Sequence, residues 1–100
     1  DPALIERIRI DPTIANNLIA SKNFFLGFLS RNDQWQRHHN HNQLRITRII
    51  KSLMLLVSRD EAESFHRDVM SLIHTNSFIP NKAYEHWNLA LGNKPASQAS

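Results

Sequence analysis

The sequence predicts an all-α fold, a compact bundle of about five helices with a buried third helix at its centre. Through most of the chain, apolar residues recur three and four positions apart, which is the spacing of one face of an α-helix. Two Asp-Pro pairs and one Ser-Arg-Asp-Glu run have the composition of helix N-termini. No stretch of useful length alternates between apolar and polar residues, so strands are not indicated.

The first two expected helices each begin with an Asp-Pro pair, because Asp accepts hydrogen bonds at an N-cap and Pro fits the first helical position. Asp1-Pro2 opens a short helix over about residues 2–9. A second Asp-Pro pair, at residues 11 and 12, opens a longer helix over about residues 12–29. The apolar side of the longer helix carries Ile14, Leu18, Phe25, Phe28 and Leu29.

The third expected helix follows a polar stretch over residues 30–42, in which Trp35 is the large apolar residue that should fix the loop to the body. The helix covers about residues 42–57, with Asn40 or Asn42 as its cap. It is apolar on two sides, which is typical of the central helix of a bundle. One side carries Ile46, Ile49, Ile50, Leu53, Leu56 and Val57, and the opposite side carries Leu44 and Leu55 beside Arg48.

The fourth expected helix begins almost without a loop, because Ser58 and Glu61 have the spacing of a capping box. It runs to about His74. Its apolar positions have helical spacing and should be buried. These are Ala62, Phe65, Val69, Leu72 and Ile73.

The last expected helix covers about residues 82–91 and ends at Gly92, since glycine readily adopts the left-handed conformation that closes a helix. Residues 93–100 are small and polar and are expected to be a disordered tail. We therefore expect one domain over residues 1–92. The chain begins at Asp1 without Met, so we also expect it to be part of a larger protein.

The composition is that of an ordinary globular domain, with 41% hydrophobic and 21% charged residues among 100. The chain has no cysteine, which excludes disulfides and thiolate metal sites. No apolar run approaches the roughly 18 residues of a membrane span. No signal-peptide pattern opens the sequence either.

The positive charge is concentrated in the middle of the chain. The net charge is +3 with the histidines neutral, yet residues 31–51 hold five basic side chains against a single acidic one, Asp33. This asymmetry suggests an anionic partner, such as nucleic acid, a membrane surface or an acidic peptide. The simpler alternative is a solvated positive face.

Arg45 and Arg48 lie three positions apart on the third helix, and Lys51 follows one turn later. One hypothesis is that they bind an anion, a phosphate or a bidentately held carboxylate. The other is structural, with the arginines tying loop carbonyls and Asp33 to the helix. The flanking leucines, at positions 44 and 55, favour partial burial of Arg48 and therefore the structural role.

Histidines raise the question of a metal site, because His at i and i+3 can share a metal ion. The candidate ligands are His38, His39 and His41, with His74 or His86. No carboxylate lies at metal-ligand spacing and no thiolate is present, so a structural polar loop is the favoured interpretation. No metal and no cofactor are expected.

Sequence-specific DNA binding and catalysis are both disfavoured. The tight join between the third and fourth helices allows a helix-turn-helix, but Asp60, Glu61 and Glu63 at the start of the fourth helix would repel phosphates. The chain has no Gly-rich phosphate loop, no nucleophile motif and no convincing pair of acids. We therefore do not expect an enzyme, and no residue is assigned a catalytic role.

Residues 40–53 have the order Asn-His-Asn-Gln-Leu-Arg-Ile-Thr-Arg-Ile-Ile-Lys-Ser-Leu, and this run resembles the signature of the opioid growth factor receptor conserved domain. Shorter pieces are similar to the family on both sides. They are Asp11-Pro12, Phe25-Leu26-Gly27-Phe28, Trp35, Glu61-Ala62 with Phe65, and Tyr84 with Trp87. The resemblance covers about residues 11–91. The chain lacks the Trp-Leu-Phe-Pro-like run that begins the family, and Val57 stands where the family tends to place Gly.

The resemblance implies a non-catalytic, receptor-like binding module. In animal members the ligand is the peptide Met-enkephalin, and the protein associates with the nucleus and nuclear envelope without a classical membrane span. A bacterial member would be cytoplasmic. The ligand-binding residues that we expect are Trp35, His39, Asn40, His41, Asn42, Arg45, Arg48 and Lys51.

In this hypothesis the arginines take a carboxylate or phosphate, and the Asn and His side chains hydrogen-bond a peptide backbone. Two alternatives stay open. The same basic residues could bind nucleic acid or an anionic surface, or the domain could be a purely structural or interaction segment of a larger protein.

Overall fold

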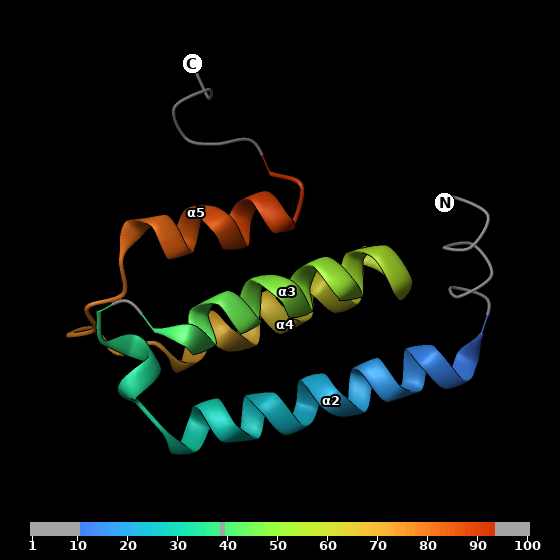
Figure 1. The fold of residues 1–100 in the computed structure, drawn as a ribbon, viewed down its shortest axis with the longest axis horizontal. Coiled ribbons are helices and arrows are strands. Elements are labelled where there is room, and N and C mark those ends of the chain that lie inside the picture. Colours follow the sequence, from blue (N-terminus) through green and yellow to red (C-terminus); the bar gives the residue numbers. More distant parts are fainter. Residues whose placement is uncertain (1–10, 39, 94–100) are drawn as a thin grey trace.

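A computed structural model describes residues 11–38 and 40–93, and this part of the chain is all-α (Figure 1). The first expected helix, over residues 2–9, lies outside the described residues, as does the expected tail from residue 94 onward. The described residues form four α-helices, where about five were predicted for the whole chain. They are α2 (Pro12–Arg31), α3 (His41–Leu56), α4 (Arg59–Leu72) and α5 (Asn81–Ala90), with a 3-10 turn, η1 (Gln34–Gln36), before α3.

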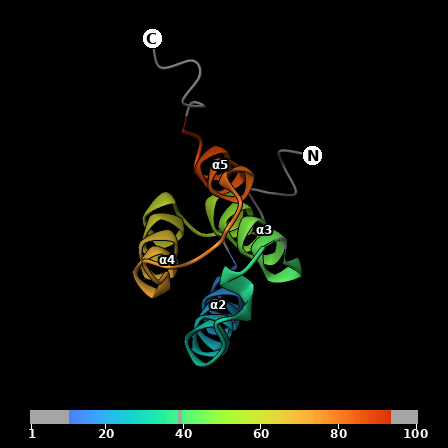
Figure 2. The ribbon, with the colours of Figure 1, turned by 90° about the vertical axis from the view of Figure 1, so that its left-hand side faces the viewer.

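The helix α3 lies at the centre of this arrangement and contacts α2, α4, α5 and η1. Viewed along the helices, α5 and α2 lie on opposite sides of α3, while α4 packs beside it (Figure 2). The helices α3 and α5 run in the same direction, and α2 and α4 run against them (Figure 1). The predicted central position of the third helix is confirmed. One flank of α3 has no helix over it in this part of the chain (Figure 2).

The core forms where the apolar sides of the helices meet at α3. Ile46, Ile50 and Leu53 of α3 are fully buried, as expected from their helical spacing. Phe65 of α4 and Trp87 of α5 are also fully buried against them. Burial of such large side chains contributes roughly 1.5–3 kcal/mol each, which makes this layer the main source of stability.

The predicted N-caps of α2 and α3 are confirmed. The backbone N–H of Thr13 donates to Asp11 Oδ1 over 2.9 Å. The backbone N–H of Asn42 donates to Asn40 Oδ1 over 2.8 Å, so Asn40 is the cap of α3. Each side chain satisfies one of the backbone donors that a helix start leaves without a partner.

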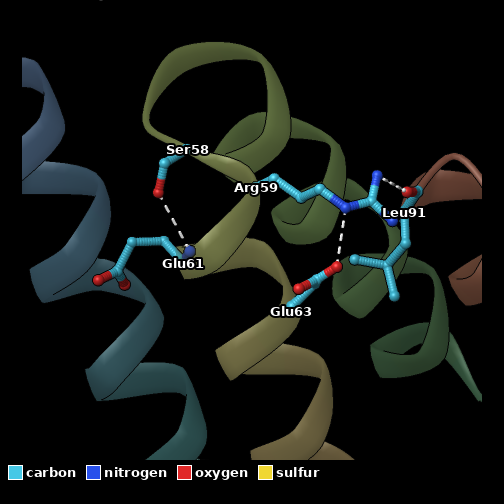
Figure 3. Close-up of polar contacts among 5 residues, drawn as sticks. All are labelled: Ser58, Arg59, Glu61, Glu63 and Leu91. Carbon is cyan, nitrogen blue, oxygen red and sulfur yellow. Dashed lines mark hydrogen bonds and ion pairs between the residues drawn. The ribbon is translucent and has the colours of Figure 1, made fainter.

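The predicted capping box at the start of α4 forms only in part (Figure 3). Ser58 Oγ accepts from the backbone N–H of Glu61 over 3.1 Å. The Ser58 N–H donates instead to the main-chain oxygen of Leu53, over 2.9 Å. The Glu61 carboxylate is therefore free to approach Lys22 on α2, with 3.6 Å between Oε2 and Nζ.

The end of α5 is closed by Gly92, as predicted. Gly92 has a φ of 81°, in the left-handed region that favours glycine. Its N–H donates to Leu89 over 2.9 Å, and the N–H of Asn93 donates to Asn88 over 3.0 Å, the bond pattern of a Schellman motif. Arg59 holds this end to α4, because its Nη1 donates to the Leu91 oxygen over 2.9 Å and its Nε to Glu63 over 2.7 Å (Figure 3).

Gln36 joins the two long connections of the fold. Its Nε2 donates to the main-chain oxygen of Leu72, and its Oε1 accepts from the N–H of His74, both over 2.8 Å. Its own main-chain oxygen accepts from the N–H of Phe78 over 2.8 Å. The His38 N–H adds a bond to the main-chain oxygen of Phe78 over 3.0 Å, so the loop before α3 and the loop after α4 are held together.

Candidate functional site

The structure divides the predicted binding residues between two sides of α3. At about 100° of rotation per residue, Arg45 and Arg48 turn toward α2, whereas Asn40 turns toward α5. Accordingly, the two arginines line a groove with α2, and Asn40 lines a separate cavity with α5. His39 lies outside the described residues. A single small ligand would not contact the whole predicted set.

The groove between α2 and α3 combines aromatic and arginine side chains. Its volume is about 620 Å³, within the range of small-ligand sites. We call it the α2–α3 groove, and it is lined by Ala20, Ser21, Phe24, Phe25, Phe28, Arg45, Arg48 and Ile49.

The aromatic wall of the α2–α3 groove comes from α2. The Phe25 and Phe28 rings stack with their centroids 6.1 Å apart and an angle of 11° between them. Phe25 is buried, while Phe24, one position earlier, is 77% exposed. A large apolar side chain so exposed on a helix beside a groove is available to a partner.

The arginines form the opposite, cationic wall. The guanidinium carbon of Arg45 lies 4.9 Å from the centroid of the Phe25 ring, a cation–π contact between the helices. Arg48 is exposed, and neither arginine pairs with a carboxylate in residues 11–38 and 40–93. The groove therefore holds two positive charges that a ligand can neutralise.

The expected structural role of these arginines does not match the structure. Asp33, their expected partner, lies 3.6 Å from Arg37 instead. Leu44 and Leu55, expected to bury Arg48 partly, are themselves exposed. The physical reason is the arrangement of the bundle, in which α2 and α5 lie on opposite sides of α3 and no helix of residues 11–38 and 40–93 covers the face between them (Figure 2).

Trp35 belongs to the core. Its side chain is 1% exposed, and its indole Nε1–H donates to the main-chain oxygen of Leu29 over 3.0 Å. Its predicted role in fixing the loop is confirmed. Because the Trp35 side chain is buried, it is not part of a contact surface on the exterior of the described fold.

The remaining predicted residues lie at the start and along the outer face of α3. Asn40 uses its side-chain oxygen as the cap of the helix. His41 is exposed and Asn42 half-buried. Lys51 is exposed beyond Arg48 and does not line the α2–α3 groove. Arg45, Arg48 and Lys51 therefore lie across the face of α3 that no helix covers in the described part of the chain.

Two functional candidates were not predicted. Phe24 was not singled out, although it is a large apolar residue outside the apolar side of its helix, and that position is a usable signal. Gln43 is buried and donates from Nε2 to the main-chain oxygens of Trp35 and His38, each over 2.8 Å. No local pattern marks Gln43, because its partners are brought to it by the loop.

Residues 11–38 and 40–93 were expected to hold neither a metal ion nor a membrane-spanning helix. No group of three or more His, Cys, Asp or Glu side chains there could hold a metal ion. No helix in these ranges is both long enough and apolar enough to cross a bilayer.

Burial lowers the pKa of His66 below its ordinary value, and the neighbouring charge of Arg67 lowers it further.

A second hollow, of about 670 Å³, lies where the ends of α2 and α4 meet the loops that follow them. Its buried polar member, Gln36, already has partners for both its amide nitrogen and its oxygen. We therefore regard the α2–α3 groove as the better candidate site.

Comparison with known proteins gives no relative for this chain. No family model, no curated protein and no solved structure matches it.

Proposed function

We propose that this domain is a non-catalytic binding module that recognises a short peptide in the α2–α3 groove. The observation that carries the proposal is that Phe24, which is exposed, and two arginines that form no ion pair within residues 11–38 and 40–93 line one groove. The resemblance of residues 40–53 to the opioid growth factor receptor conserved domain supports the same function. Met-enkephalin is the ligand of that family's animal members and is therefore the first peptide to test.

The two walls of the groove suit the two parts of a peptide terminus. A carboxylate would be held by the guanidinium groups of Arg45 and Arg48, which can each donate two parallel hydrogen bonds. An apolar or aromatic side chain would pack on Phe24 and Phe28. The contact with Phe25 orients Arg45 before the ligand arrives, which lowers the entropy lost on binding.

Binding of nucleic acid or an anionic surface is the second candidate function. One observation favours it, namely that the basic residues Arg45, Arg48 and Lys51 continue beyond the groove, across the face of α3 that no described helix covers. Against it, the first turn of α4 carries Asp60 and Glu61. Binding through phosphates would weaken steeply with added salt, because it depends on counterion release.

A titration of the ¹⁵N-labelled domain followed by NMR tests the proposal. Met-enkephalin is added at low and at moderate salt, and a short nucleic-acid duplex is added in a parallel series. We expect saturable shifts from the peptide at residues 20–28 and 45–49. Shifts from the duplex alone that vanish with salt would establish the second candidate instead. No response to either ligand would leave the domain as a structural segment.

The two most exposed phenylalanines supply a matched pair of variants. Phe24→Ala removes the aromatic side chain beside the α2–α3 groove and should weaken peptide binding. Phe78→Ala removes one that is 65% exposed in the loop before α5, stacked on His38, and should leave binding unchanged. Equal effects of the two variants would place the peptide elsewhere.

A further inference from the structure

The α2–α3 groove continues past Arg48 into a smaller hollow of about 110 Å³, which we call the side pocket. Some residues line both the groove and the side pocket, so the two hollows adjoin. These are Ser21, Arg48 and Ile49. Other residues of α2 and α3 line the side pocket and not the groove. These are Leu18, Lys22, Ser52 and Leu53.

The side pocket presents an almost entirely apolar surface. Leu53 is fully buried at the surface of the core, and Leu18 and Ile49 are half-buried beside it. Lys22 contributes its aliphatic stem, because its side chain is only 10% exposed and its ammonium is paired with Glu61 at 3.6 Å. A ligand group that covers this surface must therefore be apolar itself.

The volume of the side pocket selects a side chain of moderate size. About 110 Å³ corresponds to roughly four water molecules at their volume in the liquid. Side chains of about four non-hydrogen atoms match this volume, namely those of leucine, isoleucine and methionine. The side chain of alanine would leave most of the pocket uncovered, and an aromatic ring would exceed it.

Arg48 lies where the groove and the side pocket meet, and this position decides which residue of a peptide enters the pocket. The function proposed for the groove has Arg45 and Arg48 hold a peptide carboxylate. The carboxylate and the side chain of a C-terminal residue branch from the same carbon atom. A carboxylate held at Arg48 therefore brings that side chain to the side pocket. A C-terminal lysine would meet the like charges of Lys22 and Arg48 there.

We infer that the domain selects peptides whose C-terminal residue is aliphatic and of the size of leucine, isoleucine or methionine. The carboxylate lies at Arg48, and the side chain of the same residue fills the side pocket. An aromatic or apolar residue earlier in the peptide packs on Phe24 and Phe28. The inference rests on the function proposed for the α2–α3 groove, and it adds the terminal residue that this groove accepts.

Four peptides test the inference by NMR on the whole domain with labelled amide and methyl groups. They are Met-enkephalin and its analogues that end in leucine, alanine or lysine. We expect the methionine and leucine peptides to bind alike, and the alanine and lysine peptides to bind about tenfold more weakly, because the pocket stays uncovered. The methionine and leucine peptides alone should shift the methyl signals of Leu18 and Leu53, which line the side pocket and not the groove.

Two serine variants separate the side pocket from the rest of the site. Ser52→Leu fills the pocket from α3 and should weaken the methionine and leucine peptides about tenfold, with little effect on the alanine peptide. Ser64→Leu makes the same change at a half-buried serine of α4 that lines neither hollow, and it should leave all affinities unchanged. If Ser52→Leu does not fold, the comparison of the four peptides on the wild type still decides.

The outcomes distinguish this inference from the proposed function on which it rests. Absence of saturable shifts from all four peptides would overturn both. Saturable shifts in the groove with equal affinity for the methionine and alanine peptides would overturn the inference alone. Unchanged methyl signals of Leu18 and Leu53 in the bound state would do the same, as would equal effects of the two serine variants.

Discussion

The guanidinium of Arg45 on α3 lies over the ring of Phe25 on α2, 4.9 Å from its centroid. This contact holds the arginine in place without neutralising it, because an aromatic face attracts a cation but carries no net charge. The charge therefore remains available to a ligand in the α2–α3 groove. Arg48, one turn further along α3, lines the same groove and is exposed.

Replacing Arg48 by Ala should leave the free energy of unfolding within about 0.5 kcal/mol of the wild-type value, because the side chain is exposed and makes no ion pair among the described residues. Urea unfolding followed by circular dichroism measures the change. A fall of more than about 1.5 kcal/mol in the free energy of unfolding would show that Arg48 stabilises the contact between α3 and the loop that precedes it.

Replacing Gln43 by Leu should destabilise the domain by about 2–4 kcal/mol, because the main-chain oxygens of Trp35 and His38 both lose their amide donor. Gln34→Leu is the matched control, since Gln34 is exposed in η1, and it should change stability by less than about 0.5 kcal/mol. Similar losses in the two variants would mean that the Gln43 amide does not support the loop.

Replacing Glu61 by Gln should cost about 1–2 kcal/mol, less than a fully buried ion pair because the Glu61 side chain is 36% exposed. The loss arises at Lys22, whose side chain is only 10% exposed and has Glu61 as its acidic neighbour. Glu63→Gln on the same helix breaks a more exposed pair with Arg59 and should cost less than about 0.5 kcal/mol. Thermal unfolding of both variants shows which one loses more stability. A larger loss of stability for Glu63→Gln than for Glu61→Gln would contradict the prediction.

Burial, with a smaller contribution from Arg67, lowers the pKa of His66 below the ordinary 6.5, so the unfolded chain binds a proton more readily than the folded one. The stability that neutral His66 contributes is therefore present above pH 6.5 and is lost as the pH falls through the folded pKa. Acidification from about pH 8 to about pH 5 should destabilise the wild type more than His66→Gln. The other five histidines are common to both proteins, so an identical pH dependence would contradict this assignment.

The helix positions could be predicted because their signals are local. Asp11, Asn40, Ser58 and Gly92 each act within a few residues of their own position, and each closes or opens a helix where the sequence indicates. Two helix ends differ from the prediction. The helix α2 continues to Arg31, beyond the expected end at about residue 29, and α4 ends at Leu72, before the expected end at about His74. At the end of α4, Leu72 and His74 form main-chain hydrogen bonds with the side chain of Gln36, more than thirty residues earlier, and no local pattern contains that contact.

The candidate site could be predicted only in part. The spacing of Arg45 and Arg48 predicted that they share one face of a helix, and both residues line the α2–α3 groove. Their exposure did not follow from spacing, because α3 is apolar on two sides and only the positions of α2 and α5 decide which side stays open (Figure 2). Phe24 and Gln43 became candidates through the same tertiary arrangement.

The central claim is that the arginines of the α2–α3 groove hold a peptide carboxylate, and calorimetric titration with two forms of one peptide tests it most directly. Met-enkephalin and its C-terminal amide are titrated into the wild type and into the Arg45→Gln/Arg48→Gln variant. We predict that amidation weakens binding to the wild type about tenfold and has little further effect in the variant, because the charge partners are already gone. An equal effect of amidation in both proteins, or none in the wild type, would contradict the account.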